Sequence, residues 1–542
     1  MNHTKKFLKK MTAGIAASAL VISGSSTVFA AGSYQETEKG ALDKLVSGAE
    51  AYLDTYAENL DKAKAGSKAT LTLTAEDAGK SLLGMVSGMD FSWLNTITMD
   101  MDATIQDSVE AVAVDLLVND AALCTMNMIM DMADLMEYIQ IPELSQSWMS
   151  MSMFSASADG TDTELSDEAA GQIQIMSDIM NLIPDSATAG TLLDRYGNLI
   201  IDNMSEGASV EETVSVEGIS EDCTAYEGQL TEAGLNAMAK EILTTAKDDQ
   251  ELKTLIDTWA GSADSEDLYT RFQSGIDSLL ADITEEGSDT AILTSKVWTN
   301  ADGKIVGREF SVTDGGESIP VFTWKSPSQD GNSALLLEIS TGTDSYSLTG
   351  SGQTAEGLLN GTYIAAYNGV EAADFSVENL ETKPTAAGYY NGTITVSFPN
   401  NGTEENPNPL TGFGAVIDLI SDAEAETSQI DISITSSGAP LATLSIAGGY
   451  GEGADVTDIS SVGETLSANS NEDMTAYVQG MDWSALLDNA KAAGIPEELV
   501  TQIDSALQSA VASSTNSDGT AAETEEPATD SSASGEETDA AA

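Results

Sequence analysis

Short segments in which apolar and polar residues alternate constrain the fold of this chain most. Five of them follow one another with short links, at 94–106, 109–118, 122–132, 135–141 and 147–154. A period of two is typical of a strand with one buried face, and strands with such short links pair as antiparallel hairpins. A second series runs from residue 291 to about 450, where Asn-Gly and Asp-Gly turn signals separate about nine further strands.

Segments with a helical period separate these two series. Residues 35–64 place apolar side chains three or four positions apart, which predicts a long amphipathic helix. The same spacing predicts helices at 166–182, 187–204, several between Thr231 and residue 279, and two at 483–493 and 497–511. We therefore expect an α+β fold, with a large curved antiparallel sheet, or sheets, packed against amphipathic helices.

The length and composition of the chain suggest its domain organisation. Its 542 residues exceed what one compact core usually holds, so two subdomains or one long continuous sheet are both open. The last segment lacks aromatic and large aliphatic residues and is expected to be a disordered acidic tail. The predicted units are a signal peptide (1–30), a leading helix with a Met-rich sheet and inserted helices (31–285), a β-rich subdomain or sheet continuation (286–470), C-terminal helices (471–512) and the tail (513–542).

The N-terminal segment has the order of a secretory signal. Lys5, Lys6, Lys9 and Lys10 precede an apolar run at 13–22, and Val28-Phe29-Ala30 precedes Ala31. No later stretch approaches roughly 18 continuous apolar residues, and no cysteine follows the predicted cut as a lipid attachment point. We expect a secreted, extracellular protein without a lipid anchor and without stable membrane insertion.

A strongly negative charge limits the partners. The chain has 88 acidic and 21 basic residues, a formal net charge of −67, and export would remove four lysines and no acid. Such a field repels nucleic acid, so we expect no nucleic-acid partner. Cations are attracted, and loosely bound calcium stays open. The densest acidic loop, at 159–164, lacks the spacing of an EF-hand, and the sequence predicts no defined metal site.

The absence of histidine removes most catalytic chemistry. The single histidine, His3, lies inside the predicted signal peptide, so the mature chain has no imidazole base, no histidine metal ligand and no partner for a Ser or Cys nucleophile. The mature chain also has no Ser-x-x-Lys sequence, and no local signature singles out a carboxylate pair. We therefore expect a protein that is not an enzyme and needs no cofactor.

Methionines on alternate positions are the most unusual local pattern. Alternate residues of a strand share one face, so three neighbouring strands would present one broad thioether surface. Such a surface could pack on the chain's own helices, bind an apolar ligand or bind Cu(I), although a regular sheet spreads the sulfur atoms too widely for most copper sites. The candidate residues are Met99, Met101, Met126, Met128, Met130, Met132, Met149, Met151 and Met153.

The two cysteines allow two states. Cys124 has the same strand parity as Met126, which predicts a buried free thiol, whereas Cys223 begins another predicted strand. Outside the cell a disulfide between them is permitted. The sequence leaves open whether they meet.

The order of these elements resembles a known architecture. A leading helix, a meander with one apolar face, inserted helices and a further meander resemble, over residues 35–285, the outer-membrane lipoprotein carriers and related mycobacterial lipid-binding lipoproteins. The segment Tyr138-Ile139-Gln140-Ile141-Pro142-Glu143-Leu144, which leads into Trp148-Met149-Ser150-Met151, resembles a strand-to-loop passage of uncharacterised secreted proteins of Gram-positive anaerobes. The resemblance implies a curved sheet that wraps around helices and leaves an apolar groove.

Two classes of function remain. The first is a carrier or sensor that binds an apolar molecule or lipid between the Met-bearing sheet face and the helices. The second is an extracellular structural or adhesive scaffold with a filled core and no small ligand. The carrier requires a concavity lined by Met126, Met128, Met130, Met149 and Met151, whereas the scaffold requires these side chains to be closely packed.

Overall fold

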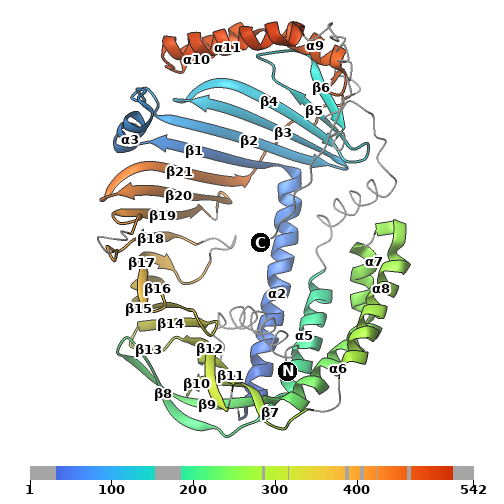
Figure 1. Ribbon diagram of the computed structural model, residues 1–542, viewed down its shortest axis with the longest axis vertical. Helices are drawn as coiled ribbons and strands as arrows, with labels where there is room; N and C mark the ends of the chain where they lie inside the picture. Colours follow the sequence, from blue (N-terminus) through green and yellow to red (C-terminus); the bar gives the residue numbers. More distant parts are fainter. Residues whose placement is uncertain are drawn as a thin grey trace, which may run out of the picture.

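The chain forms an α+β protein built on one large sheet (Figure 1). The computed structural model describes residues 32–152, 185–259, 261–283, 287–314, 316–384, 390–402, 408–422, 424–459 and 465–516. Within these residues 22 strands belong to a single, mostly antiparallel sheet. The predicted signal peptide, acidic loop and helix at 166–182 lie outside the described residues, as do Met153 and residues 517–542 of the predicted tail. Residues 513–516, predicted to begin the disordered tail, instead continue the last helix.

The strands fall into three groups along the chain. The first contains β1 (Ser67–Ala75), β2 (Thr96–Gln106), β3 (Val109–Val118), β4 (Ala121–Asp131), β5 (Met136–Gln140) and β6 (Trp148–Ser152). The second contains β7 (Ser205–Glu206), β8 (Val210–Val216) and β9 (Ile219–Thr231). The third contains β10 (Ala291–Asn300), β11 (Ile305–Asp314), β12 (Glu317–Lys325), β13 (Ser328–Gln329), β14 (Asn332–Ser340), β15 (Ser345–Ala355), β16 (Leu358–Tyr367), β17 (Val370–Glu381), β18 (Gly392–Ser397), β19 (Phe413–Asp422), β20 (Thr427–Ser436) and β21 (Ala439–Tyr450).

The described residues between 291 and 450 thus contain twelve strands, β10–β21, and the sequence-based number of about nine was too low. The backbone conformation of two hairpin turns in this segment explains why the links between its strands are so short. Asn368 and Gly369, between β16 and β17, both have positive φ angles, 50° and 74°. Ser437 and Gly438, between β20 and β21, have the same property. Two successive positive φ angles are required by the tight hairpin turn that matches strand twist, and Asn-Gly is its preferred sequence.

One pairing joins the two halves of the chain into a continuous sheet. β10, the first strand of the third group, pairs antiparallel with β9. The later strands of the group pair in turn as far as β21. β21 then pairs antiparallel with β1, with Leu71 opposite Ile446. From β1 the sheet continues through β2 to β6, and β22 (Thr465–Ser467) adds a short parallel edge. Of the two predicted arrangements, the chain adopts the single sheet.

Helix α2 (Tyr34–Ala65) runs along the concave side of this sheet (Figure 1). Ser33 caps its first turn by accepting a hydrogen bond from the backbone N–H of Glu36, and Glu206 of β7 accepts from the N–H groups of Tyr34 and Gln35. Its last turn leads through Gly66 directly into β1. The helix therefore connects the β9 end of the arch to the β1 end.

The other helices lie beside α2 or at the ends of the sheet (Figure 1). α5 (Ser186–Asp202) packs along the first half of α2, where Gly197 allows close approach of the Leu42 side chain. α6 (Glu232–Asp248), α7 (Gln250–Trp259) and α8 (Gly261–Asp282) follow β9. α9 (Asn471–Gly480), α10 (Trp483–Ala492) and α11 (Glu497–Asn516) cover the β4 to β6 end, and α9 was not predicted. α3 (Asp77–Ser87) packs on β21.

The largest buried core lies beneath the N-terminal end of α2. Tyr34 and Ala41 of α2 pack there against residues of β9, β10 and β11, including Leu230, Val297 and Ile305. A smaller core, around Cys223 and Trp298, lies on the opposite side of the same strands. Both cores are confined to one end of the sheet.

Candidate functional site

The side of the sheet that faces α2 is uncharged over most of its length. Directly paired residues of neighbouring strands share a face, so the register assigns every side chain to one side. The ring of Tyr34 packs on Gly228, and this contact identifies the concave face. From β14 through β21 to β1 and β2, the register places only apolar, Gly, Ser or Thr residues on that face.

The acidic residues of these strands lie on the convex face. Thr70 donates a hydrogen bond to Asp100 at 2.7 Å, Thr393 donates to Asp418 at 2.6 Å, and Ser433 pairs with Thr443. Hydroxyl and carboxylate side chains thus form cross-strand rows that water can solvate. This separation leaves the concave face of these strands uncharged, although the convex face also exposes apolar side chains such as Ile364 and Ile420.

The central part of the concave face is not closely packed. Ile446 of β21 is 42% exposed, and Ile430, its partner on β20, is 40% exposed. Leu73 of β1 and Tyr346 of β15 are also exposed. Side chains in a filled core are normally almost completely buried. The middle strands therefore present a half-exposed apolar wall.

Helix α2 leaves this wall uncovered. Residues 54–58 of the helix are all exposed, and Tyr52 is 68% exposed. The contacts between α2 and the sheet concentrate at β9, at the N-terminal end, and at β1 and β2, at the C-terminal end. Tyr52 and Tyr56 contact each other, with ring centroids 6.4 Å apart. The middle of the helix and the middle of the sheet face each other without packing together.

The lengths of the two elements explain this gap. A 32-residue helix is about 48 Å long at 1.5 Å per residue. The twelve interstrand steps from β9 to β1 cover about 58 Å at about 4.8 Å per step. An arc of this length over that chord bows away by roughly 14 Å in the middle, in addition to the normal helix-to-sheet packing distance. We call the resulting space, bounded by α2 residues 45–60 and the concave face of β14–β21, β1 and β2, the concavity.

The methionines continue the concave face beyond β2, as their alternation predicted. Met99 and Met101 lie on β2, and the register places Met126, Met128 and Met130 of β4 and Met149 and Met151 of β6 on the same side. All seven are partly buried. Met132 follows the end of β4, where its backbone N–H donates to Ser108, and is partly buried as well.

The three Met-bearing strands are not direct neighbours, contrary to the prediction. β3 lies between β2 and β4 and contributes Val112, Val114 and Leu116 to the concave face, and β5 separates β4 from β6. The hairpin order of the meander makes this unavoidable, because each strand pairs with the next along the chain. The thioether surface is therefore interleaved with aliphatic side chains and, beside Met130 and Met151, with the carboxylates of Glu110 and Glu137.

Most of the concave wall comes from residues that the sequence analysis did not single out. Ile430, Ile446 and Leu444 belong to the C-terminal half, which has no Met pattern. Their alternation with polar residues was visible as a strand signal. The missing information was that β21 pairs with β1, which places these residues on the same surface as the methionines.

The two cysteines are free thiols on opposite sides of the sheet. Cys124 pairs with Leu116 on the concave face of β4, whereas Cys223 lies in the small core of β9. Burial, followed by the nearby Glu143 carboxylate, raises the pKa of Cys124. Burial, followed by the Glu221 carboxylate, raises the pKa of Cys223 to about 12. The disulfide left open by the sequence is not formed, because the strand order separates β4 from β9, and both thiols are protonated near neutral pH.

A buried ion pair fixes the N-terminal end of α2 to the sheet. Arg308 of β11 donates from Nη1 to both carboxylate oxygens of Glu38, at 2.5 and 2.7 Å. Arg308 is 2% exposed and Glu38 6% exposed. At the other end, Lys62 donates to Glu426 at 2.8 Å and lies over the ring of Tyr450, but these side chains are partly exposed. The concavity therefore lies between two attachments of α2 to the sheet, one buried at the N-terminal end of the helix and one partly exposed at its C-terminal end.

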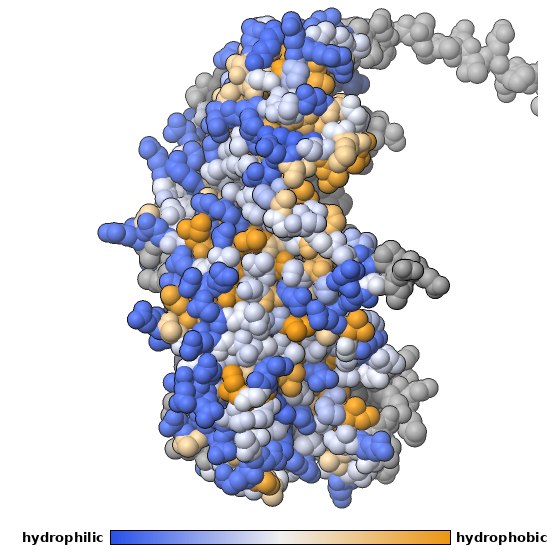
Figure 2. Space-filling view, turned by 90° about the vertical axis from the view of Figure 1, so that its left-hand side faces the viewer, coloured by the Kyte–Doolittle hydropathy of each residue, from blue (hydrophilic) through white to orange (hydrophobic). Residues whose placement is uncertain are grey.

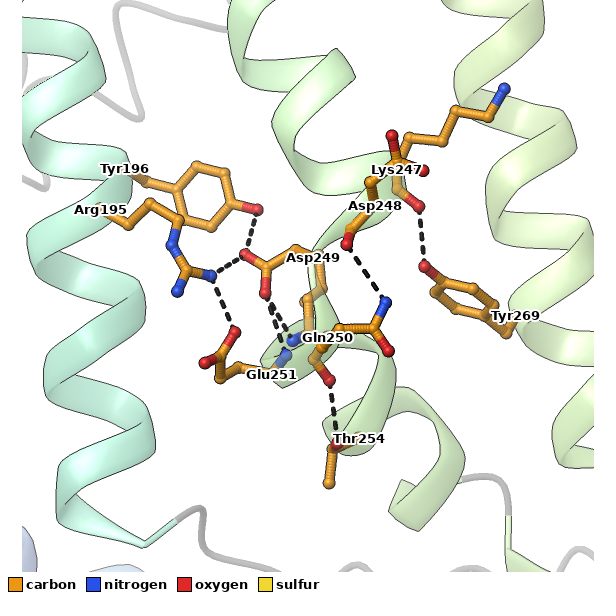
Figure 3. Close-up of polar contacts among 10 residues, drawn as sticks. Arg195, Tyr196, Lys247, Asp248, Asp249, Gln250, Glu251, Thr254 and Tyr269 are labelled. Carbon is orange, nitrogen blue, oxygen red and sulfur yellow. Dashed lines mark hydrogen bonds and ion pairs between the residues drawn. The ribbon is translucent and has the colours of Figure 1, made fainter.

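A second polar cluster joins α5 to α7 outside the concavity (Figure 3). Arg195 donates to Asp249 at 2.5 Å and to Glu251 at 3.1 Å, and Tyr196 donates to Asp249 at 2.8 Å. The Asp249 carboxylate also accepts from the first N–H groups of α7. Burial of Asp249 opposes its ionisation, but the hydrogen bonds from Arg195, Leu252 and Tyr196 outweigh it and lower its pKa to about 2. These groups satisfy one another and form a structural link.

The described residues contain no group of three or more His, Cys, Asp or Glu side chains that could hold a metal ion. Nor does any helix in the described part of the chain have the length and apolar character needed to cross a membrane. Comparison with protein-family models and with curated proteins gives no match to this chain.

Proposed function

We propose that this chain is a secreted, non-enzymatic binding protein that holds an elongated apolar molecule, such as an acyl chain or a lipid, in the concavity. The observation that carries the proposal is the uncharged concave face, on which Ile430 and Ile446 remain about 40% exposed. The middle of α2, which lies opposite this face, is exposed as well. Soluble proteins rarely expose contiguous apolar surface of this kind unless it binds a partner.

The shape of the concavity favours a long, flexible ligand. Each CH₂ group transferred from water to an apolar surface contributes about 0.8 kcal/mol, so an acyl chain lying across several strands gains affinity from its length without needing specific polar contacts. The thioethers of β2, β4 and β6 adapt to irregular apolar shapes at one end of this surface. On the facing helix, Tyr52 and Tyr56 combine apolar rings with hydroxyl groups that stay in water.

Mass spectrometry of the mature protein from its native source tests the proposal directly. We expect a stoichiometric apolar molecule that remains bound under native conditions and is released by organic extraction. A mass without ligand, unchanged after incubation with mixed lipids, would contradict the proposal. It would leave the extracellular scaffold, whose partners meet the polar rows of the convex face, as the function.

A matched pair of variants locates the site. Ile430→Asp introduces a charge on the concave face of β20, and Ile420→Asp introduces one on the convex face of the neighbouring β19. The two side chains are similarly exposed, at 40% and 49%. We expect Ile430→Asp to reduce binding of a fluorescent fatty acid strongly and Ile420→Asp to leave it unchanged, while both variants keep the wild-type circular dichroism spectrum. Equal binding by both variants would place the ligand elsewhere.

A further inference from the structure

The tip of α3 is an uncharged apolar surface on the outside of the molecule. Residues 81–89, Ser-Leu-Leu-Gly-Met-Val-Ser-Gly-Met, contain no charged side chain between Lys80 and Asp90. Met85 is 77% exposed and Val86 83% exposed, and Leu82, Leu83 and Met89 are also among the exposed large hydrophobic residues. We call these five side chains the α3 tip.

The opposite side of α3 is attached firmly to the sheet, so the exposure does not result from a detached helix. Gly79 is buried against the backbone of Leu441, where a Cβ atom would lie 2.0 Å from the carbonyl oxygen. The N–H of Glu76 donates to the same carbonyl, and Lys80 donates to Asn95 at 2.8 Å. The fold therefore holds the apolar side chains of the tip in water.

The α3 tip lies at the rim of the concavity. β1 carries the half-exposed Leu73 on its concave face, and α3 begins two residues after the end of β1. Figure 1 shows α3 at the margin of the sheet, at the ends of β1 and β21. Figure 2 views this side of the molecule, where hydrophobic clusters interrupt a mostly hydrophilic surface.

We propose that the α3 tip docks reversibly on the surface of a neutral lipid bilayer. A short helix end with several large apolar side chains inserts into the boundary between head groups and acyl chains, and its affinity depends on the apolar area that it buries. The absence of charge in the tip suits a neutral surface, and the strongly acidic remainder of the chain is repelled by anionic lipid. Lipid docking goes beyond ligand binding in the concavity and does not depend on it.

A second copy of the chain fits this surface less well. Stable protein interfaces bury about 800 Å² on each partner, which is more than five side chains at a helix end provide. Two chains of formal net charge −67 also repel each other. A bilayer imposes no such requirement on shape or area.

Vesicle flotation of the full mature chain tests lipid docking. We expect the wild-type protein to float with phosphatidylcholine vesicles and to bind phosphatidylglycerol vesicles more weakly. The double variant Met85→Ser/Val86→Ser should lower the partition coefficient on phosphatidylcholine by about tenfold or more, because two apolar side chains no longer enter the lipid. The control Val210→Ser/Leu279→Ser changes two exposed apolar residues far from α3 in sequence, 51% and 54% exposed, on β8 and α8, and should bind as the wild type does.

Three results would overturn the proposal: no flotation of the wild-type protein, equal flotation of the two double variants, or a wild-type dimer in sedimentation equilibrium that Met85→Ser/Val86→Ser converts to a monomer. Binding of the fluorescent fatty acid is measured on the same samples. A Met85→Ser/Val86→Ser protein that keeps fatty-acid binding but loses flotation separates lipid docking from ligand binding.

Discussion

The two ends of α2 and its middle meet the same sheet in opposite ways. At the ends, Tyr34, Glu38 and Lys62 contact side chains or backbone of the sheet, and at the N-terminal end the contacts are almost completely buried. In the middle, residues 54–58 contact water although an apolar wall lies opposite. The attachment of α2 and the exposure of its central residues are thus separate properties of one helix.

This difference shows how a folded protein can keep apolar surface available. Hydrophobic surfaces normally close on each other, because burial lowers the free energy by about 25 cal/mol per Å². Here a straight helix is attached at two points of a curved sheet, and its length prevents the two surfaces from meeting. The curvature itself is maintained by strand twist and by pairing along the whole sheet. Stability should therefore depend on the ends of α2 and binding on its middle.

The largest effect on stability is expected from the buried attachment. Glu38→Gln leaves the guanidinium of Arg308, which is 2% exposed, without its carboxylate. Breaking a buried ion pair by removing one partner typically costs about 3–5 kcal/mol. Urea denaturation should show this loss. Lys39→Gln, which disrupts the exposed pair of the next residue with Asp202, serves as the control and should cost at most about 1 kcal/mol. Equal losses would contradict the comparison.

A smaller effect is expected at low pH from Asp249, which links α5 and α7 beside the attached half of α2. Its folded-state pKa of about 2 lies below the usual value of 3.8, so its ionised form stabilises the folded state above about pH 4, and this contribution is lost as the pH falls through 2. The difference corresponds to roughly 2 kcal/mol. Unfolding free energies measured between pH 2 and 5 should fall less steeply in Asp249→Asn than in the wild type. Parallel curves would contradict the assignment.

The sequence predicted the local structure of these regions well. The helix expected at 35–64 is α2, Tyr34–Ala65, because its apolar spacing and the Ser33 cap are local signals. The shared face of Met126, Met128 and Met130 followed from strand geometry alone. The export segment and the predicted ligand are not tested by these observations and stay predictions.

The concavity could not be predicted in the same way, because it depends on contacts between distant residues. Leu71 pairs with Ile446, 375 positions later in the chain, and no local pattern indicates that partner. The separation of α2 from the sheet depends on how many strands lie between β9 and β1, and the predicted number was too low. The Glu38 to Arg308 pair joins residues 270 positions apart. The alternation of apolar and polar residues predicted which side chains share a face of each strand, but it did not predict which strands pair with one another.

The C-terminal attachment of α2 should matter less than the N-terminal one. Lys62 and Glu426 are 35% and 45% exposed, so water already solvates both groups and salt screens their attraction. Lys62→Met should change the melting temperature much less than Glu38→Gln, and the change should diminish as the salt concentration rises. A loss as large as that of Glu38→Gln, independent of salt, would mean that the two ends of the helix are attached equally.

The smallest effect on stability, combined with an effect on binding, is expected in the middle of α2. Tyr52→Ser/Tyr56→Ser removes two rings that contact each other and are exposed, so the free energy of unfolding should change by no more than about 0.5 kcal/mol per site. If the concavity binds an acyl chain, the same variant should weaken fatty-acid binding, because one wall loses its apolar area. Ile420→Ser, at an exposed position on the convex face of β19, is the control and should change neither quantity. A loss of 2 kcal/mol or more in the Tyr52→Ser/Tyr56→Ser protein, estimated from urea denaturation, would show that the middle of the helix is packed like its ends.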